Sequence, residues 1–285
     1  MRSARAVRRR VKSATMTGMV AVLAILAVLP LLFIFGDLVH KGASSIDWNF
    51  FVKGPAPAGE AGGGVANAIV GSLIIVALGC LVGMPIGVGT GLFLAEFGGG
   101  RLGWIVRFIA DVLNGTPSIV VGIFAWTWLV RPMGHFSALA GGAALAILMI
   151  PMLARTTEEM VRLVPNSLRE AALALGYPRW RTSLTIVART AMGGIVTGAL
   201  VAIARIAGET APLLFTALGN LNFTTAIREP MQSLSLLIYT YATGPFEDWH
   251  RIAWAAALVL MALVLTLALA ARWATRQRFG NKSAI

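Results

Sequence analysis

The longest run without a charged residue extends from Ala61 to Ala95, and it constrains the fold more than any other feature of the sequence. As a single helix, this run would reach roughly 50 Å, well beyond the bilayer hydrocarbon core of about 30 Å. Charged residues make up only 13% of the chain, and the mean hydropathy is +0.78. A soluble domain carries about a quarter charged residues. These values predict an integral membrane protein.

Six segments between the charged residues are long and apolar enough to cross a membrane as helices. The short alternating strands of a spanning β-barrel do not appear in the pattern. The sequence therefore predicts an all-α integral membrane bundle of about six transmembrane helices. Its spans are expected at about 15–36, within 61–95, and at about 112–130, 136–154, 191–214 and 252–271.

Lysine and arginine gather in alternate loops, and this asymmetry predicts the orientation of the bundle. If both termini are cytoplasmic, the inner segments hold eighteen of these residues and the outer segments hold five. We therefore expect both termini on the cytoplasmic side. The expected parts are a basic tail at 1–14, a first helix at 15–36, an outer loop at 37–64, a core at 65–273 with a cytoplasmic loop at 155–190, and a tail at 274–285.

Several classes of protein are disfavoured by the same pattern. The net charge of +12 does not indicate nucleic-acid binding, because no basic patch is interleaved with exposed aromatic residues. The first apolar stretch is too long for a signal peptide, and Cys80 is alone, so no disulfide is expected. No lysine follows a glycine, so a phosphate-cradling GxxxxGK[ST] loop is absent. No metal site is expected, since the histidines are scattered: His40, His135 and His250.

The second span contains a glycine-rich stretch from Gly83 to Gly91 with Pro85 inside it. Proline removes a backbone donor, and glycine lets helices approach closely. The stretch is therefore the expected place for this long span to bend or break. A packing kink is the simpler interpretation, and a gate hinge at Pro85 and Gly87 is the functional one.

A short helix is predicted in the loop between the fourth and fifth spans. Ser167 to Glu170 fits a capping box, in which Ser167 and Glu170 satisfy free amides at a helix start. Gly176 suits the left-handed residue that ends a helix, and Pro178 prevents continuation. Such a helix is too short to be stable alone. We therefore expect it to dock, with one face formed by Leu168, Ala171, Ala172 and Leu175.

This loop resembles the EAA loop of ABC importer permeases. The resemblance lies in Glu170-Ala171-Ala172, then Gly176 after three residues, and Ile186 after nine more. The family continues with Leu-Pro, where this chain has Ala188-Arg189. In that family the loop forms a coupling helix that fits a groove of the ATPase subunit. The resemblance implies a type I importer (MetI-like) bundle, with Glu170, Ala171, Ala172 and Gly176 coupling it to an ATPase.

Two further segments resemble phosphate permeases, and the second of them resembles the PstA type in particular. They are DVLNGTPSIVVG at 111–122 and ARIAGETAPLLFTA at 204–217, and the resemblance covers about 67–273. It implies a multi-pass protein of the bacterial inner membrane that imports inorganic phosphate. The implied partners are a PstC-type permease subunit, a PstB-type ATPase dimer that binds ATP and Mg, and a phosphate-binding protein. The chain itself is then a transport subunit and not an enzyme.

Arg205 and Glu209 lie four residues apart within a predicted span, where isolated charges are costly. They could form a structural ion pair. Alternatively Arg205 lines an anion path, since guanidinium matches phosphate oxygens, and Glu209 offsets it. A carboxylate beside the path argues against a tight phosphate site. Thr116 and Ser118 flank Pro117, a possible hinge, and their hydroxyls could bond either freed carbonyls or a passing anion.

Two alternatives stay open from the sequence. One is a permease for another oxyanion such as phosphonate, sulfate or molybdate. The other is a secondary transporter that works without ATP, although such proteins usually show two related halves, and no internal repeat is visible here.

Overall fold

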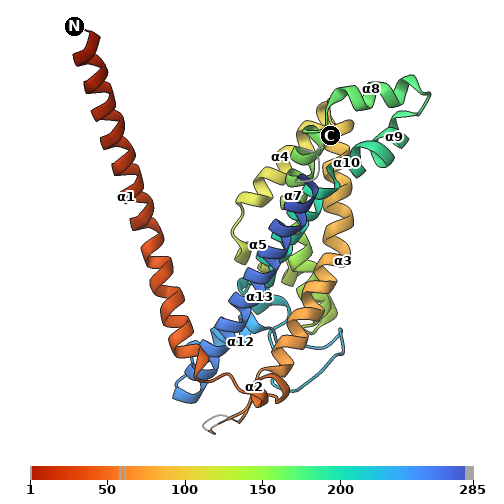
Figure 1. The fold of residues 1–285 in the computed structure, drawn as a ribbon. Helices are drawn as coiled ribbons and strands as arrows, with labels where there is room; N and C mark the ends of the chain where they lie inside the picture. The colour runs from red at the N-terminus through yellow and green to blue at the C-terminus, as the bar shows by residue number, and fades with distance from the viewer. Residues whose placement is uncertain (1, 58–59, 61, 280–285) are drawn as a thin grey trace.

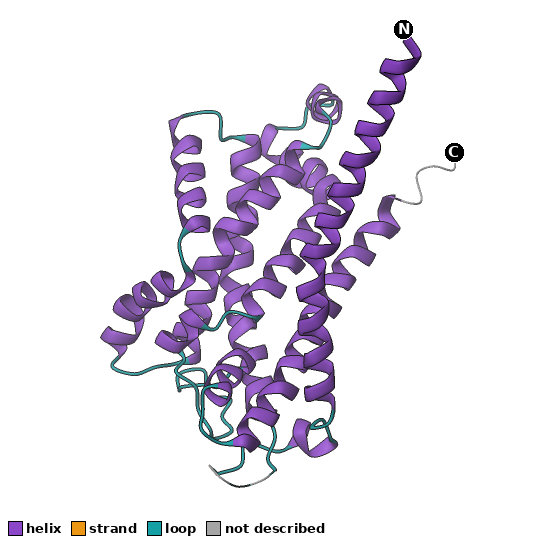
Figure 2. Cartoon of the chain, turned by 90° about the vertical axis from the view of Figure 1, so that its left-hand side faces the viewer, coloured by secondary structure: helices purple, strands orange, loops and turns teal. Residues whose placement is uncertain are grey.

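The computed structural model describes residues 2–57, 60 and 62–279, and the regular elements of this part are all helices (Figures 1 and 2). They are α1 (Arg2–Ala43), α2 (Trp48–Val52), α3 (Ala66–Glu96), α4 (Arg101–Gly115), α5 (Ser118–Ala125), the π-helix η1 (Trp126–Val130), α6 (Arg131–Met133), α7 (Ala138–Arg162), α8 (Asn166–Ala174), α9 (Arg179–Thr182), the π-helix η2 (Ser183–Val187), α10 (Ala188–Ala207), α11 (Ala211–Thr216), α12 (Leu234–Ala242) and α13 (Glu247–Phe279).

Five helical stretches in the described residues are long and apolar enough to cross a membrane. They are α1, α3, α7, α13 and the stretch from α9 through α10. A sixth span results if α4 and the stretch from α5 to α6 count as one bent span. The expected bundle of about six helices is therefore confirmed. The N-terminal end of α1, the C-terminal end of α13 and α8 lie at one end of the molecule, with α2 at the other (Figure 1).

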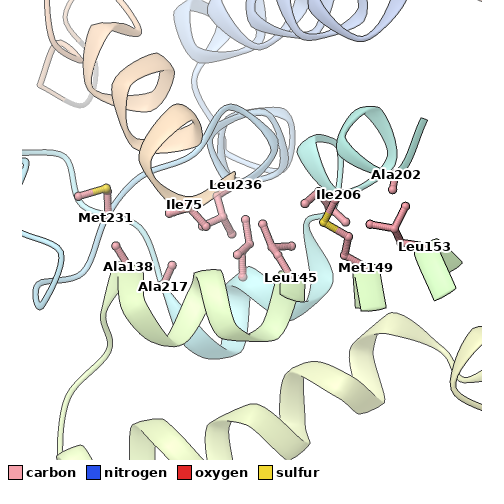
Figure 3. Close-up of a cluster of buried hydrophobic side chains, with 11 residues drawn as sticks. Ile75, Ala138, Leu145, Met149, Leu153, Ala202, Ile206, Ala217, Met231 and Leu236 are labelled. Atoms are coloured by element: carbon pink, nitrogen blue, oxygen red, sulfur yellow. The ribbon is translucent and has the colours of Figure 1, made fainter. Parts of the chain in front are cut away.

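The core of the bundle is the long contact between α3 and α7. From Gly79 to Gly91, every fourth residue of α3 on this side is a glycine. A Cβ at Gly83 would lie 3.1 Å from Met149 Sδ, and a Cβ at Gly87 would lie 2.9 Å from Leu153 Cβ. The glycines thus let the two backbones approach closely. Leu145, Met149 and Leu153 of α7 continue this contact into a buried apolar cluster (Figure 3).

The glycine-rich stretch does not break the second span, so the break that was one of the two expected outcomes there is wrong. α3 is one helix of 31 residues that passes through Pro85. Packing against α7 explains why the helix continues, because Gly83, Gly87 and Gly91 lie directly against residues of α7. A gate hinge at Pro85 and Gly87 has no helix break to support it.

The expected third span is wrong as a single helix, because it contains a break, and the expected fifth span is present but ends at Ala207, before the predicted end. α4 ends at Gly115 and α5 begins at Ser118, with a bend of 105° between the two helical stretches. Pro117 lacks the amide hydrogen that would continue α4, which accounts for the break. In the fifth span, α10 ends at Ala207 and α11 starts at Ala211, followed by Pro212.

The helices run further toward the predicted cytoplasmic side than the apolar segments do. α7 ends at Arg162, and α9 begins at Arg179. The segment 163–178 between them contains α8, so most of the predicted loop at 155–190 is helical. α7 continues because the charges of its last turns pair with Arg107 and Asp111 of α4. α1 likewise extends past the predicted 15–36 at both ends.

α1 stands apart from the rest of the bundle along most of its length (Figure 1). It meets α13 near its C-terminal end, where a Cβ at Gly42 would lie 2.7 Å from the carbonyl oxygen of Trp254. Lys41 Nζ lies 4.7 Å from the Trp254 ring centroid. The first span is therefore an addition to a compact core of α3 to α13.

Candidate functional site

The loop helix α8 is closed at its C-terminal end by Gly176. Gly176 has φ +83°, the left-handed conformation expected from the sequence. Its amide donates to Leu173 O at 2.9 Å, and the Tyr177 amide donates to Ala172 O at 3.1 Å. These two bonds form the Schellman motif that satisfies the last carbonyls of a helix.

The start of α8 differs from the expected capping box. The residue that precedes the helix is Pro165, and no side chain caps the first turn. Ser167 lies inside the helix at its second position. The physical reason is Pro165, whose fixed φ and missing donor suit a helix start and place the boundary two residues before Ser167.

α8 leaves most of its apolar side chains uncovered by the described chain. Ala172 alone of the predicted docking face is buried, while Leu168 and Leu175 are exposed, Leu175 at 78%. Leu173 is exposed as well. Since a nine-residue helix is not stable in isolation, the exposed face needs either a partner or a firm anchor to the bundle.

The structure provides that anchor through Arg169. Its Nε and Nη2 donate to Glu96 Oε1 at 2.9 and 2.8 Å, and Glu96 is the last residue of α3. Nη1 also donates to Val164 O at 2.6 Å, and Nη2 donates to Val161 O at 3.0 Å. The other carboxylate oxygen of Glu96 accepts a bond from Ser183 Oγ at 3.1 Å.

A second charge cluster surrounds Glu158 of α7, whose side chain is only 2% exposed. Its oxygens lie 2.6 Å from Arg107 Nε, 3.3 Å from Arg155 Nη1 and 2.6 Å from Arg162 Nη2. Arg155 Nε also lies 2.9 Å from Asp111 Oδ1 of α4. The cluster therefore joins α4 to α7 on the side of the molecule where α8 lies.

Sequence reasoning missed both clusters, because it treated these arginines only as charges that fix orientation. A signal was present for the second one. Glu158 lies three residues after Arg155 and four residues before Arg162, and both spacings bring opposite charges together on one helical face. The Arg169–Glu96 pair had no such signal, since 73 residues separate the two partners.

The structure only loosely pairs Arg205 and Glu209. The closest nitrogen–oxygen distance is 4.0 Å, and the two side chains are 60% and 18% exposed. Arg205 lies in the last turn of α10, and Glu209 lies in the break before α11. A tight structural pair would bury and hydrogen-bond both charges, so this arrangement leaves the guanidinium of Arg205 open to an anion.

Thr116 and Ser118 lie at the 105° bend. Thr116 Oγ1 donates to Val112 O at 2.8 Å, which satisfies its hydroxyl within α4. α5 packs on α11, where a Cβ at Gly122 would lie 2.7 Å from Pro212 Cα. Among the described residues, no hydrogen bond or ion pair joins Thr116 or Ser118 to Arg205.

Two hollows lie beside these elements. A polar cavity of about 370 Å³ between α8 and the bundle is lined by Glu96, Arg162, Arg169, Arg179 and neighbouring residues. An apolar groove of about 840 Å³ lies between the end of α7 and α10, and its lining includes Thr156, Met160, Gly193, Thr197 and Val201. No group of three or more potential metal ligands is found within the described ranges.

Comparison with known proteins identifies this arrangement. Residues 87–278 match the family model described as the binding-protein-dependent transport system inner membrane component. The chain is 46% identical to the phosphate transport system permease protein PstA of Yersinia pestis, over 85% of this chain and 82% of that protein. It is 44% identical to the protein of the same name in Haemophilus influenzae, over 91% of this chain and 92% of that protein.

Solved structures show the same fold at low identity. One is a bacterial alginate ABC transporter in complex with a periplasmic protein, with TM-score 0.68 and 16% identity, over 94% of this chain and 96% of that one. Another is the MetNI methionine ABC transporter in inward-facing conformations, with TM-score 0.59 and 18% identity, over 75% of this chain and 93% of that one. These likenesses establish the predicted ABC importer permease fold.

Proposed function

The chain belongs to the binding-protein-dependent transport inner membrane components, among the PstA phosphate transport permeases. On that premise, we propose that it forms half of the path through which an ATP-driven importer moves inorganic phosphate. The identity of 42 to 46% to several curated permeases of that name supports the substrate. The chain supplies the membrane path, and ATP and Mg bind to a partner subunit.

One observation carries the mechanism: α8 is capped, anchored and exposed. Gly176 ends the helix, Arg169 ties it to α3 and α7, and its remaining apolar side chains are uncovered. A surface of this kind fits the groove of an ATPase subunit. Glu170, Ala171, Ala172 and Gly176 then form the coupling helix, and a dimer of PstB type is the expected engine.

The remaining partners follow from the same assignment. A PstC-type permease would complete the path, and the groove along α10 suits it, because Gly193 and Thr197 allow close helix packing. A phosphate-binding protein would deliver the anion from outside. The charge asymmetry, together with the common end shared by α1, α13 and α8, supports cytoplasmic termini and a multi-pass arrangement in the inner membrane.

Arg205 is the proposed anion contact in the path. Its guanidinium is permanently charged, largely exposed and only 4.0 Å from Glu209 at the closest approach. Glu209 repels a nearby anion and so favours a weak, transient site, which leaves affinity to the external binding protein. Ser118 would offer its hydroxyl to the anion. Thr116 would do the same after its hydrogen bond to Val112 O is broken. The bend at Pro117 would act as the hinge.

A permease for another oxyanion is the second candidate, since a guanidinium binds sulfate as well as phosphate. The test is uptake of labelled phosphate and labelled sulfate into vesicles that contain the assembled complex, with and without ATP. ATP-dependent uptake of phosphate alone supports the proposal. Uptake of sulfate in preference to phosphate, or phosphate uptake without the ATPase subunit, contradicts it.

A further inference from the structure

We propose that Arg169 is a positioning residue that fixes the coupling helix to the ends of α3 and α7, so that movement imposed on α8 is transmitted to the membrane bundle. The inference rests on the proposed function of α8. It goes beyond the coupling motif, because Arg169 lies outside the Glu170-Ala171-Ala172 and Gly176 positions and faces the bundle instead of the solvent.

The guanidinium joins three helix ends at one point. Arg169 belongs to the first turns of α8, Val161 lies in the last turn of α7, and Glu96 is the last residue of α3. One side chain donates to two carbonyls and one carboxylate across these ends. Only arginine has enough donors in a fixed plane for this, since an ammonium group is a point charge on a flexible stem.

Glu96 holds the other side of the coupling loop as well. Its Oε1 accepts from Arg169, and its Oε2 accepts from Ser183 Oγ at 3.1 Å, at the start of the stretch that continues into α10. The loop therefore leaves α7 and re-enters α10 while attached at both sides to one carboxylate of α3. Because α10 carries Arg205, displacement of α8 is passed directly to the helix that bears the proposed anion contact.

Arg107 extends the connection to the bend. It donates to Leu94 O at 2.7 Å and to Gly98 O at 2.8 Å, and its Nε lies 2.6 Å from Glu158. The end of α3 is thus held by Arg169 from α8 and by Arg107 from α4. α4 in turn ends at the bend beside Pro117. Hydrogen bonds and ion pairs, linked through the end of α3, therefore connect α8 to both proposed moving parts.

The burial of the pair makes it strong enough for this role. The Arg169 and Glu96 side chains are 19% and 10% exposed, so water screens their attraction weakly. Removing either partner leaves the other charge without compensation. The helix would still be closed by Gly176 and could still meet the ATPase, but its position relative to α3 would no longer be fixed.

The first test measures uptake per ATP hydrolysed in the assembled complex. Arg169→Gln is expected to leave ATP hydrolysis within about twofold of wild type and to lower phosphate uptake per ATP by about tenfold. Phosphate uptake per ATP in Arg169→Lys should lie between that of wild type and that of Arg169→Gln. Glu96→Gln should show the same loss as Arg169→Gln, because it removes the other partner of the ion pair. Arg179→Gln is the matched control, because the Arg179 side chain lines the same cavity and makes no ion pair or hydrogen bond within the described residues.

A purely structural role predicts a different result. If hydrolysis and uptake fall in parallel in Arg169→Gln, or if only the amount of assembled complex falls, the positioning role is refuted. Unchanged uptake per ATP in both Arg169→Gln and Glu96→Gln refutes it as well.

A second measurement does not depend on the substrate. Spin labels at Ser167→Cys on α8 and Gly99→Cys after α3 can be placed in a Cys80→Ala background, because the chain has one cysteine. The mean distance between the labels should be the same in the nucleotide-free and vanadate-trapped complexes. The distribution of distances should broaden in Arg169→Gln. A wild-type distance that changes through the cycle overturns the proposal. A constant distance in a complex that fails to import phosphate contradicts only the proposed substrate.

Discussion

Replacing Gly176 by valine tests how much the docking surface depends on the end of α8. Gly176 has φ +83°, and nothing lies within 4 Å of a Cβ built there. A larger side chain would therefore meet no steric neighbour in this chain. The only cost within the chain is that of holding an L-residue in the left-handed conformation.

That cost can be estimated from backbone preferences. The left-handed region costs an ordinary residue roughly 1–2 kcal/mol, and a β-branched residue more. A cost of about 1.4 kcal/mol corresponds to a tenfold change in an equilibrium. The Gly176→Val loop should therefore lose its two Schellman bonds in most molecules, and the population competent to dock should fall about tenfold. Asparagine tolerates this conformation, so Gly176→Asn should retain most of the function.

The assay is co-purification of the ATPase subunit with the permease, followed by ATP hydrolysis and phosphate uptake in vesicles. Gly176→Val should reduce captured ATPase and uptake together, and Gly176→Asn should stay within about twofold of wild type. Wild-type capture and uptake in Gly176→Val would show that the closed end of α8 does not shape the docking surface.

Three further outcomes are expected. Arg205→Gln should lower phosphate uptake at least about tenfold with assembly and binding-protein affinity intact, and undiminished uptake in an assembled complex would refute the anion contact. Gly91→Ala should destabilise the protein by roughly 1–3 kcal/mol and lower its unfolding temperature in detergent, because the new Cβ would lie 2.5 Å from Ala154 O. Gly89→Ala is the control and should melt like wild type, because a Cβ there has nothing within 4 Å. Equal melting of the two variants would contradict the α3–α7 packing. Glu158→Gln should destabilise the protein by about 3–5 kcal/mol, since three arginines lose their shared carboxylate, and a wild-type melting temperature would argue against the cluster.

The sequence predicted the features that depend on local chemistry. Apolar runs predicted the helical bundle, and Gly176 with Pro178 predicted where α8 ends, because a left-handed glycine and a missing donor act on their own neighbours. The start of α8 was misplaced by two residues because Pro165 and Ser167 both offer a plausible beginning. Only the bond pattern of the folded loop distinguishes them.

Features that depend on packing could not be predicted. Pro85 and Pro117 look alike in sequence, yet α3 passes through Pro85 while α4 and α5 separate at Pro117. The difference is that α7 covers the glycines around Pro85, a contact between segments far apart in the chain. The pairing of Arg169 with Glu96 has the same origin, since it appears only when α8 folds back on α3.

Site-specific photocrosslinking from Leu175 tests the central claim most directly. A photoreactive residue at Leu175, the exposed apolar residue that directly follows α8, should crosslink to the ATPase subunit in intact cells, while one at Leu221 in the loop between α11 and α12 should not. Crosslinking from Leu175 only to lipid or to the external binding protein, with none to the ATPase subunit, would contradict the account.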